Sequence, residues 1–306
     1  MKMNILLALI FLMTSCLNEK DKRITEIPVD PPIATGIVYF ESAVDIENAY
    51  SNLKTALRNN ENISIIKEFD HSQNAASANM TLSPTRIIFF GNPNLGTPLM
   101  QENQLAGLDL PQKVLFYKEG DQVFALYNST EYLASRYGIK GVETLSQISN
   151  ALNSLVGNAV EAQGTNTKTQ TVDLEEGIVS VESTTDFEST YNTLISEIEA
   201  NGNISLITEM DHKLNAGSAG LELRPTRLIM FGNPRLGSPL MQSARSIGLD
   251  LPQKMLVWED EDAKVFISYN DPEFIKEKHR ISGKQEQIEQ ISKVLEMLAN
   301  SAAGIE

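Results

Sequence analysis

Short hydrophobic runs alternate with amphipathic segments along most of this chain. Runs such as 36–40 and 86–90 are rich in β-branched and aromatic residues, which is typical of β-strands. Between them, 46–57 carries apolar residues at the spacing of an α-helix. Two further hydrophobic runs within 113–127 flank a Gly-Asp turn and predict a hairpin. The pattern predicts the order β-α-β-α-β-α-β-β-α-α, an α/β fold in which a mixed sheet packs with helices.

The same pattern occurs twice in the chain. The segments 86–117 and 227–258 are identical at 20 of 32 positions, at a constant offset of 141 (227 − 86). Insertions raise the offset to 142 and then to 143 near the end of each copy. We therefore expect two tandem domains over 36–158 and 177–301, each of ordinary domain size. The segment between them is polar and predicts a linker over 159–176.

The first residues resemble a bacterial lipoprotein signal. Lys2 is followed by an apolar run over 5–13, too short to span a bilayer as a helix, and then by small residues before Cys16. We expect Cys16 to be lipidated and to anchor the protein to a membrane of the cell envelope, the outer membrane, outside the cytoplasm. An ordinary secretory signal with a coincidental cysteine is the alternative. The remaining predicted divisions are a signal peptide over 1–15, a tether over 16–35 and a tail over 302–306.

Composition narrows the classes of partner. The chain is 42% hydrophobic and 21% charged, as globular proteins are, and its net charge is −15. Neutralising phosphates requires clustered Lys and Arg, so nucleic acid is not an expected partner. The chain has one cysteine, so burial rather than an intramolecular disulfide has to stabilise the fold.

Motifs shared by the two copies resemble the DUF302 family. In the first copy they are Phe69-Asp70-His71, Phe90-Gly91-Asn92-Pro93, Gly96-Thr97-Pro98-Leu99-Met100 and Leu110-Pro111. The second copy repeats them, with Met210 in place of Phe and Ser238 in place of Thr. The resemblance covers nearly all of the chain outside the tether and the linker. It implies two tandem domains of the TT1751-like fold and, because single domains of this family tend to form homodimers, an intramolecular pseudo-dimer. The resemblance implies no reaction, cofactor or catalytic residue.

Polar elements that recur in both copies form the candidate ligand-binding site. The candidate residues are Asp70, His71, Arg86 and Asn92 in the first copy and Asp211, His212, Arg227 and Asn233 in the second. Histidine suits acid–base work near neutral pH, arginine can bind a carboxylate or phosphate, and the Gly-Asn-Pro loop precedes a helix start that could hold an anion. We expect that helix to begin at Thr97, with Pro98 in its first position. We also expect each Asp-His pair to meet the Gly-Asn-Pro loop of its own copy at strand ends.

Each candidate also has a structural interpretation. The aspartates can cap the following helix, the histidines can pack or hydrogen-bond, the arginines can form salt bridges, and the loops can be simple turns. No metal or cofactor is expected, because the chain lacks a P-loop and its three histidines lack metal-ligand spacing. The chain also lacks a Gly-x-Ser-x-Gly elbow, so no Ser or Cys nucleophile is assigned. We expect a non-catalytic protein that binds a small molecule or an envelope protein in a cleft between the copies. The alternative is an enzyme that uses His71 and His212 as acid–base groups beside the loops.

Overall fold

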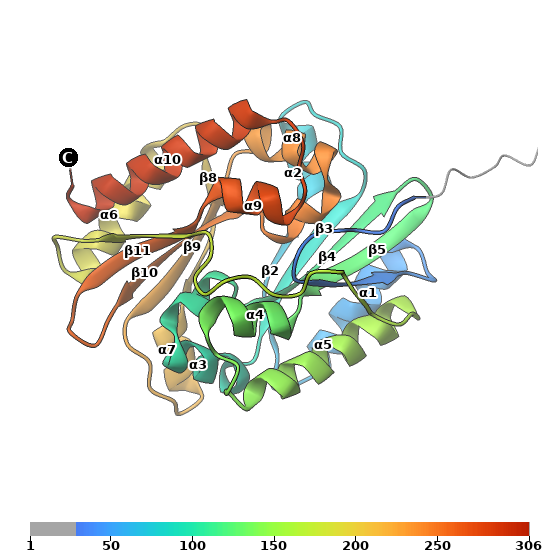
Figure 1. Ribbon diagram of the computed structural model, residues 1–306, viewed down its shortest axis with the longest axis horizontal. Coiled ribbons are helices and arrows are strands. Elements are labelled where there is room, and N and C mark those ends of the chain that lie inside the picture. Colours follow the sequence, from blue (N-terminus) through green and yellow to red (C-terminus); the bar gives the residue numbers. More distant parts are fainter. Residues whose placement is uncertain (1–28, 306) are drawn as a thin grey trace, which may run out of the picture. The chain divides into compact units, whose positions relative to one another are not determined.

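Each copy folds into a five-stranded antiparallel sheet packed with helices (Figure 1). A computed structural model describes residues 29–305. The expected signal peptide, Cys16 and most of the expected tether lie outside these residues. Pro31–Glu306 form a single compact unit that holds both copies. No helix within 29–305 is both long enough and apolar enough to cross a membrane.

The two copies have the same succession of elements. In the first copy these are β1 (Ile37–Glu41), α1 (Ile46–Arg58), β2 (Ser64–Asp70), α2 (His71–Ser77), β3 (Thr85–Gly91), α3 (Pro93–Glu102), the 3-10 helix η1 (Gln104–Leu108), β4 (Gln112–Glu119), β5 (Gln122–Asn128), α4 (Thr130–Tyr137) and α5 (Thr144–Val160). In the second copy they are β7 (Ile178–Glu182), α6 (Phe187–Ala200), β8 (Ser205–Asp211), α7 (His212–Ser218), β9 (Thr226–Gly232), α8 (Pro234–Ser243), the 3-10 helix η2 (Arg245–Leu249), β10 (Gln253–Glu259), β11 (Val265–Asn270), α9 (Pro272–Lys278) and α10 (Gln285–Ala303). The predicted α/β class, two tandem domains and element order are confirmed, and η1 and η2 are additional.

The strand order is β2-β3-β4-β5-β1 in one sheet, extended beyond β1 by the short strand β6 (Thr165–Asn166), and β7-β11-β10-β9-β8 in the other. The pattern predicted mixed sheets, but every strand pair formed by the described residues is antiparallel. The reason is that the connection from β1 through α1 carries the chain to the far edge of the sheet, so β1 pairs with β5 and not with β2.

Part of the expected linker belongs to the first sheet. Thr165 and Asn166 form β6, which pairs with Tyr39 and Val38 at the edge of β1. The backbone amide of Thr167 continues this contact by donating to the Ile37 carbonyl at 3.1 Å. The segment 159–176 therefore connects the copies and also covers a sheet edge, which would otherwise expose unpaired backbone groups.

The central strands bury both of their faces. Ile88 and Phe90 of β3 belong to the core cluster beneath the helices. Ile87 and Phe89 alternate with them and are 0% and 1% exposed, so they pack on the opposite face. There η2 of the second copy lies on β3, β4 and β5, and η1 reciprocally lies on β9, β10 and β11. The two copies thus bury the second face of each other's sheet.

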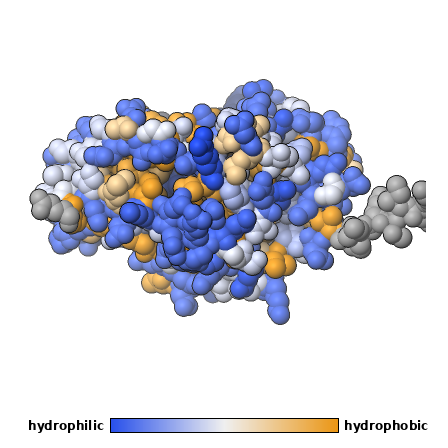
Figure 2. Space-filling view, turned by 90° about the horizontal axis from the view of Figure 1, so that it is seen from above, coloured by the Kyte–Doolittle hydropathy of each residue, from blue (hydrophilic) through white to orange (hydrophobic). Residues whose placement is uncertain are grey.

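A glycine in each 3-10 helix allows this close approach. A Cβ added to Gly248 would lie 3.0 Å from Leu115 Cδ1, and one added to Gly107 would lie 2.9 Å from Leu256 Cδ1. Both distances are shorter than ordinary carbon–carbon contacts. The face of the molecule in Figure 2 is mainly hydrophilic, and apolar residues are visible at several places on it.

Candidate functional site

The aspartates and arginines of the candidate site hold the ends of local elements together. The Gln73 amide donates to Asp70 Oδ1 at 2.9 Å, so Asp70 caps α2. Arg86 donates from Nε to Asp70 at 2.9 Å and from Nη1 to Glu47 at 2.7 Å. The second copy has the same contacts, from Leu214 N to Asp211 at 2.8 Å, from Arg227 Nε to Asp211 at 2.9 Å and from Arg227 Nη1 to Glu188 at 2.8 Å.

These contacts also fix the charge of the first aspartate. Burial by itself would raise the pKa of Asp70, but hydrogen bonds from Ser72, the Gln73 amide and Arg86 outweigh it and lower the pKa. Asp70 is therefore a permanent carboxylate near neutral pH with its hydrogen-bond acceptors in use. The geometry gives these residues structural partners, and they do not border the pockets described below.

The two histidines lie between the copies. His71 is 2% exposed and its Nε2 lies 3.0 Å from the carbonyl oxygen of Gly248 in η2. Because a carbonyl only accepts, Nε2 carries the proton and donates. His212 lies beside Gly107 of η1 in the equivalent place and is 4% exposed, but its Nε2 has no hydrogen-bond partner among residues 29–305.

Burial determines the protonation of both rings. It lowers the pKa of His71 and of His212 to about 4, against the opposing effect of the neighbouring aspartate and, for His71, of the Gly248 carbonyl. Both imidazoles are therefore neutral at pH 7. A base with such a low pKa accepts a proton poorly at neutral pH, which disfavours the acid–base role.

The Asp-His pairs do not meet the Gly-Asn-Pro loops of their own copy. In the antiparallel pair of β2 and β3, Asp70 is opposite Arg86 and Ser64 is opposite Gly91. The Asp-His pair and the loop therefore lie at opposite ends of the strands. The expected meeting occurs between copies instead, because α3 packs against α7 and α2 packs against α8 (Figure 1).

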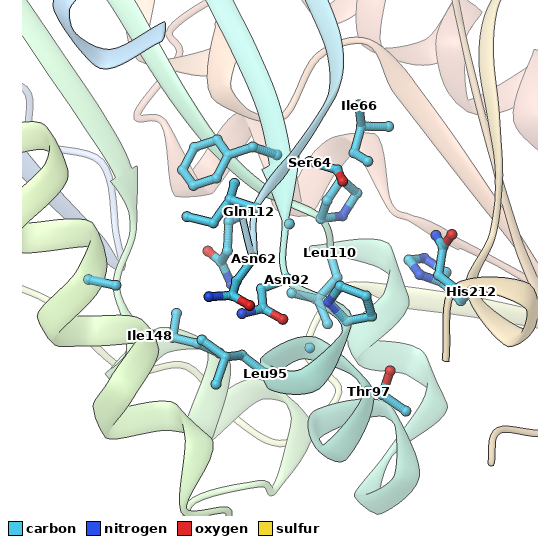
Figure 3. Close-up of a pocket in the computed structure, with 18 of the residues that line it drawn as sticks. Asn62, Ser64, Ile66, Asn92, Leu95, Thr97, Leu110, Gln112, Ile148 and His212 are labelled. Atoms are coloured by element: carbon cyan, nitrogen blue, oxygen red, sulfur yellow. The ribbon is translucent and has the colours of Figure 1, made fainter. Parts of the chain in front are cut away.

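Two equivalent pockets lie between the copies, and the larger of this pair is at the α3–α7 contact. It has a volume of about 290 Å³ and combines the loop 91–93 of the first copy with His212 and Asn215 of the second. Apolar side chains of α3, α5 and the sheet form most of its wall, and Asn62, Asn92 and Gln112 supply amides. In Figure 3 these three amide side chains lie close together, and His212 lies on the opposite side of the pocket. Among its lining residues there is no Asp, Glu, Lys or Arg.

The smaller pocket is the equivalent site at the α2–α8 contact. It has a volume of about 110 Å³ and combines the loop 232–234 of the second copy with His71 and Asn74 of the first. Asn203 and Gln253 occupy the places of Asn62 and Gln112. Its lining residues are also free of charged side chains. The two copies therefore build the same kind of pocket twice, and each pocket needs both copies.

The loop asparagines cap helices. Asn92 accepts from the Asn94 amide at 2.9 Å, and α3 begins at Pro93. The expectation that Thr97 starts the helix was wrong, because Asn92 and Pro93 form a complete start one turn earlier. Asn233 makes the same contact with Arg235 N at 2.9 Å. The asparagine side chains accept from the Asn94 and Arg235 amides, and the prolines at the helix starts have no N–H group. Few backbone donors therefore remain free at these helix starts to bind an anion.

A buried ionic cluster at the contact between the copies was missed from the sequence. In the first copy Asp109 accepts from Lys113 Nζ at 2.8 Å, from Arg136 Nη1 at 3.2 Å and from Tyr137 Oη at 2.8 Å. Burial opposes ionisation of Asp109, but Lys113 and Arg136 hold its pKa well below the usual range. Asp109 is therefore a fully buried carboxylate with matched partners.

The second copy contains the same cluster with different partners. Asp250 Oδ2 accepts from Lys278 Nζ at 2.8 Å and lies 2.7 Å from His279 Nε2, while its Oδ1 has no partner within 29–305. Lys254 donates only to the backbone carbonyls of Asp250 at 2.9 Å and Pro252 at 3.4 Å. Burial lowers the pKa of Lys254 to about 7. The lysine in this copy thus lacks the carboxylate partner of its equivalent.

Two hydrogen bonds join the clusters across the copies. Lys278 Nζ donates to Asn128 Oδ1 at 2.8 Å, and Arg136 Nη2 donates to Asn270 Oδ1 at 2.9 Å. The sequence did contain a signal, because Leu-Asp-Leu-Pro-Gln-Lys is identical in both copies. Charged residues at fixed places in a hydrophobic repeat indicate buried pairing. Among the described residues, no group of three or more His, Cys, Asp or Glu is placed to hold a metal ion.

Comparison with known proteins assigns the family. The model of the family "Domain of unknown function DUF302" matches residues 38–155 and 179–298. Proteins named Fluoride-specific ion channel FluC 1 from Brucella suis biovar 1 and Brucella abortus biovar 1 are each 41% identical over 108 residues, or 35% of this chain. The match spans only 42% and 40% of those relatives. An uncharacterized conserved DUF302 protein from Bacillus stearothermophilus matches 42% of this chain and 98% of its own, at 16% identity and a TM-score of 0.38. Because the family model matches most of both copies, this chain belongs to the DUF302 family.

Proposed function

We propose that this protein binds a small organic molecule in the pockets that its two copies form between them, without catalysing a reaction. The observation that carries the proposal is the construction of the pockets. Each combines a Gly-Asn-Pro loop from one copy with the histidine-bearing helix of the other, and the arrangement occurs twice. Concave, mostly apolar sites with a few convergent polar groups are the usual form of ligand pockets.

The chemistry of the site favours binding over catalysis. His71 and His212 are neutral and buried, and the carboxylate groups of Asp70 and Asp211 are occupied by arginine and helix amides. What remains is a set of neutral amide groups against an apolar wall, joined in the larger pocket by the hydroxyl groups of Ser64, Thr97 and Ser218. Such groups orient a ligand and have no means of activating a nucleophile. The enzyme alternative would require a different protonation state of the histidines.

We place this binding at the cell envelope. The proposal is that lipidated Cys16 anchors the chain to a membrane and that the two copies act as a pseudo-dimer within one chain. Duplication then replaces association of two proteins by an intramolecular contact of high effective concentration. The channel activity in the names of the Brucella relatives is not extended to this chain, because the match covers 35% of it.

A fluorescence titration tests the proposed function. The neutral dye 1-aminoanthracene would be titrated into residues 31–306, which contain every described helix and strand. We expect saturable binding that is lost when phenylalanine fills both pockets in an Ala151→Phe, Val294→Phe variant. Ser154→Phe is the matched control, because Ser154 is exposed on the same helix as Ala151 and outside the pocket. Absence of saturable binding, or equal binding by the double variant, would refute the proposal.

A further inference from the structure

The two pockets have the same plan but different sizes. Their volumes are about 290 Å³ and about 110 Å³. An apolar cavity of about 150 Å³ holds a benzene molecule. The larger pocket therefore accepts a molecule well beyond one benzene ring, whereas the smaller pocket has less room than that.

Two differences between the copies explain why the pocket at the α2–α8 contact is the smaller one. Ala151 of α5 lines the larger pocket, and Val294 occupies its place in the smaller one, at the offset of 143. Met210 lines the larger pocket, and Phe69 occupies its place in the smaller one, at the offset of 141. Valine adds two methyl groups to alanine, and a phenylalanine ring is bulkier and stiffer than methionine. Both changes fill the smaller pocket.

An unpartnered donor marks the polar end of the larger pocket. Gln112 Nε2 is buried there without a hydrogen-bond partner among the described residues. Figure 3 shows Gln112 beside Asn62 and Asn92, at the end of the pocket away from His212. A buried donor without a partner is unfavourable, so rotation of the Gln112 amide towards a ligand oxygen in the pocket would form a hydrogen bond that the free protein lacks.

The wall of the larger pocket also determines the charge of its ligand. Its lining residues include no charged side chain, and His212 is neutral at pH 7. An ionised ligand group would lose its hydration without gaining a counter-charge, which is strongly unfavourable. The remaining surface of the pocket is mostly aliphatic, from residues such as Leu95, Leu110 and Leu152.

We propose that the larger pocket binds an uncharged, medium-chain amphiphile whose carbonyl or hydroxyl oxygen accepts from Gln112, and that Ala151 and Met210 set the size of that ligand. The smaller pocket accepts only shorter molecules of the same kind, because Val294 and Phe69 fill it. This inference rests on the proposed function and specifies the ligand class and the residues that select it.

Ligand charge is tested by displacement of 1-aminoanthracene from residues 31–306 at pH 8. The competitors are decanol, decanamide and decanoate, which share a chain length and differ in the head group. We expect decanol and decanamide to displace the dye at concentrations at least about tenfold lower than decanoate, corresponding to about 1.4 kcal/mol. Equal displacement by decanoate would overturn the assignment of an uncharged ligand.

Size selection is tested by exchanging the two differences. An Ala151→Val, Met210→Phe variant should lose at least about tenfold in affinity for decanol while retaining binding of butanol. The reverse variant, Val294→Ala with Phe69→Met, should gain a second decanol site in calorimetry. Each residue introduced already occurs at the equivalent place in the other copy, and circular dichroism confirms folding. Unchanged affinity and stoichiometry in both variants would overturn the size assignment.

The hydrogen bond is tested by Gln112→Leu, with Gln253→Leu as the matched control in the smaller pocket. The first variant should weaken the binding of decanamide about five- to tenfold, as expected for the loss of one hydrogen bond. The control should leave decanamide affinity at the larger pocket unchanged. Equal effects of both variants would overturn the role of Gln112. If the wild-type protein binds no dye, the proposed function itself fails, whereas dye binding without these selectivities refutes only the present inference.

Discussion

Lys254 is a buried ammonium group without a carboxylate partner, and replacing it should stabilise the protein near neutral pH. It is 3% exposed and donates only to two backbone carbonyls. Burial is the main cause that lowers its pKa, and the nearby Lys113 adds to it, so that the pKa falls from 10.5 to about 7. The unfolded chain therefore binds more protons than the folded protein between pH 7 and 10.5, and stability should rise with pH over that window.

The magnitude follows from the pKa difference. At 1.36 kcal/mol per pKa unit, keeping Lys254 buried costs about 4 kcal/mol at pH 7 and about 2 kcal/mol at pH 9. A Lys254→Met variant removes this cost but leaves the carbonyls of Asp250 and Pro252 unpaired, a loss of about 1–3 kcal/mol. The variant should therefore be about 1–3 kcal/mol more stable than wild type at pH 7. At pH 9 it should lie within about 1 kcal/mol of wild type.

Urea denaturation at pH 7 and pH 9 measures this difference, because other titrating groups cancel between wild type and variant. Lys113→Met is the matched control, since Lys113 donates to Asp109 Oδ1 at 2.8 Å. Removing one partner of a buried ion pair should destabilise the protein by about 3 kcal/mol. If Lys254→Met is as destabilising as Lys113→Met at pH 7, or if its effect is the same at both pH values, the reasoning is wrong.

Three further predictions concern the backbone, the histidines and the anchor. Gly177→Ala should lower the unfolding free energy by about 3 kcal/mol or more, because the new Cβ would lie 2.0 Å from Phe274 Cγ at a residue with φ +65°. Gly220→Ala is the control: Gly220 has a similar φ of +71° but open space around it, so the substitution should cost about 1 kcal/mol in the same denaturation assay. Because burial lowers the pKa of His71 and His212 from 6.5 to about 4, stability should fall as pH drops from 6.5 towards 4. The melting temperature of a His71→Gln, His212→Gln variant should fall less than that of wild type over that range. Equal falls would contradict the conclusion that these two histidines cause the loss of stability. Cys16→Ala should release the protein from membrane pellets, and continued sedimentation with membranes would rule out the lipid anchor.

Features that depend on neighbouring residues could be derived from the sequence. Helical and strand periodicity depends on residues two to four positions apart, and it predicted the succession of elements in both copies. A cap also needs only a side chain and the amides two or three residues later, which is why capping by Asp70 could be anticipated. The duplication was visible because the repeated positions can be compared directly.

The site depended on contacts between residues far apart in the chain. The antiparallel register of β2 and β3 separates His71 from Asn92 within a copy, and the packing of α3 on α7 places Asn92 and His212 on opposite sides of one pocket. The hydrophobic runs of β3, β4 and β5 are nearly unbroken, a sign that both faces of the sheet are covered, but they do not identify what covers them. Local rules determined the elements of each copy. The packing of the second sheet face against the other copy decided where the pockets and the buried charges lie, because only this packing brings together residues that are far apart in the chain.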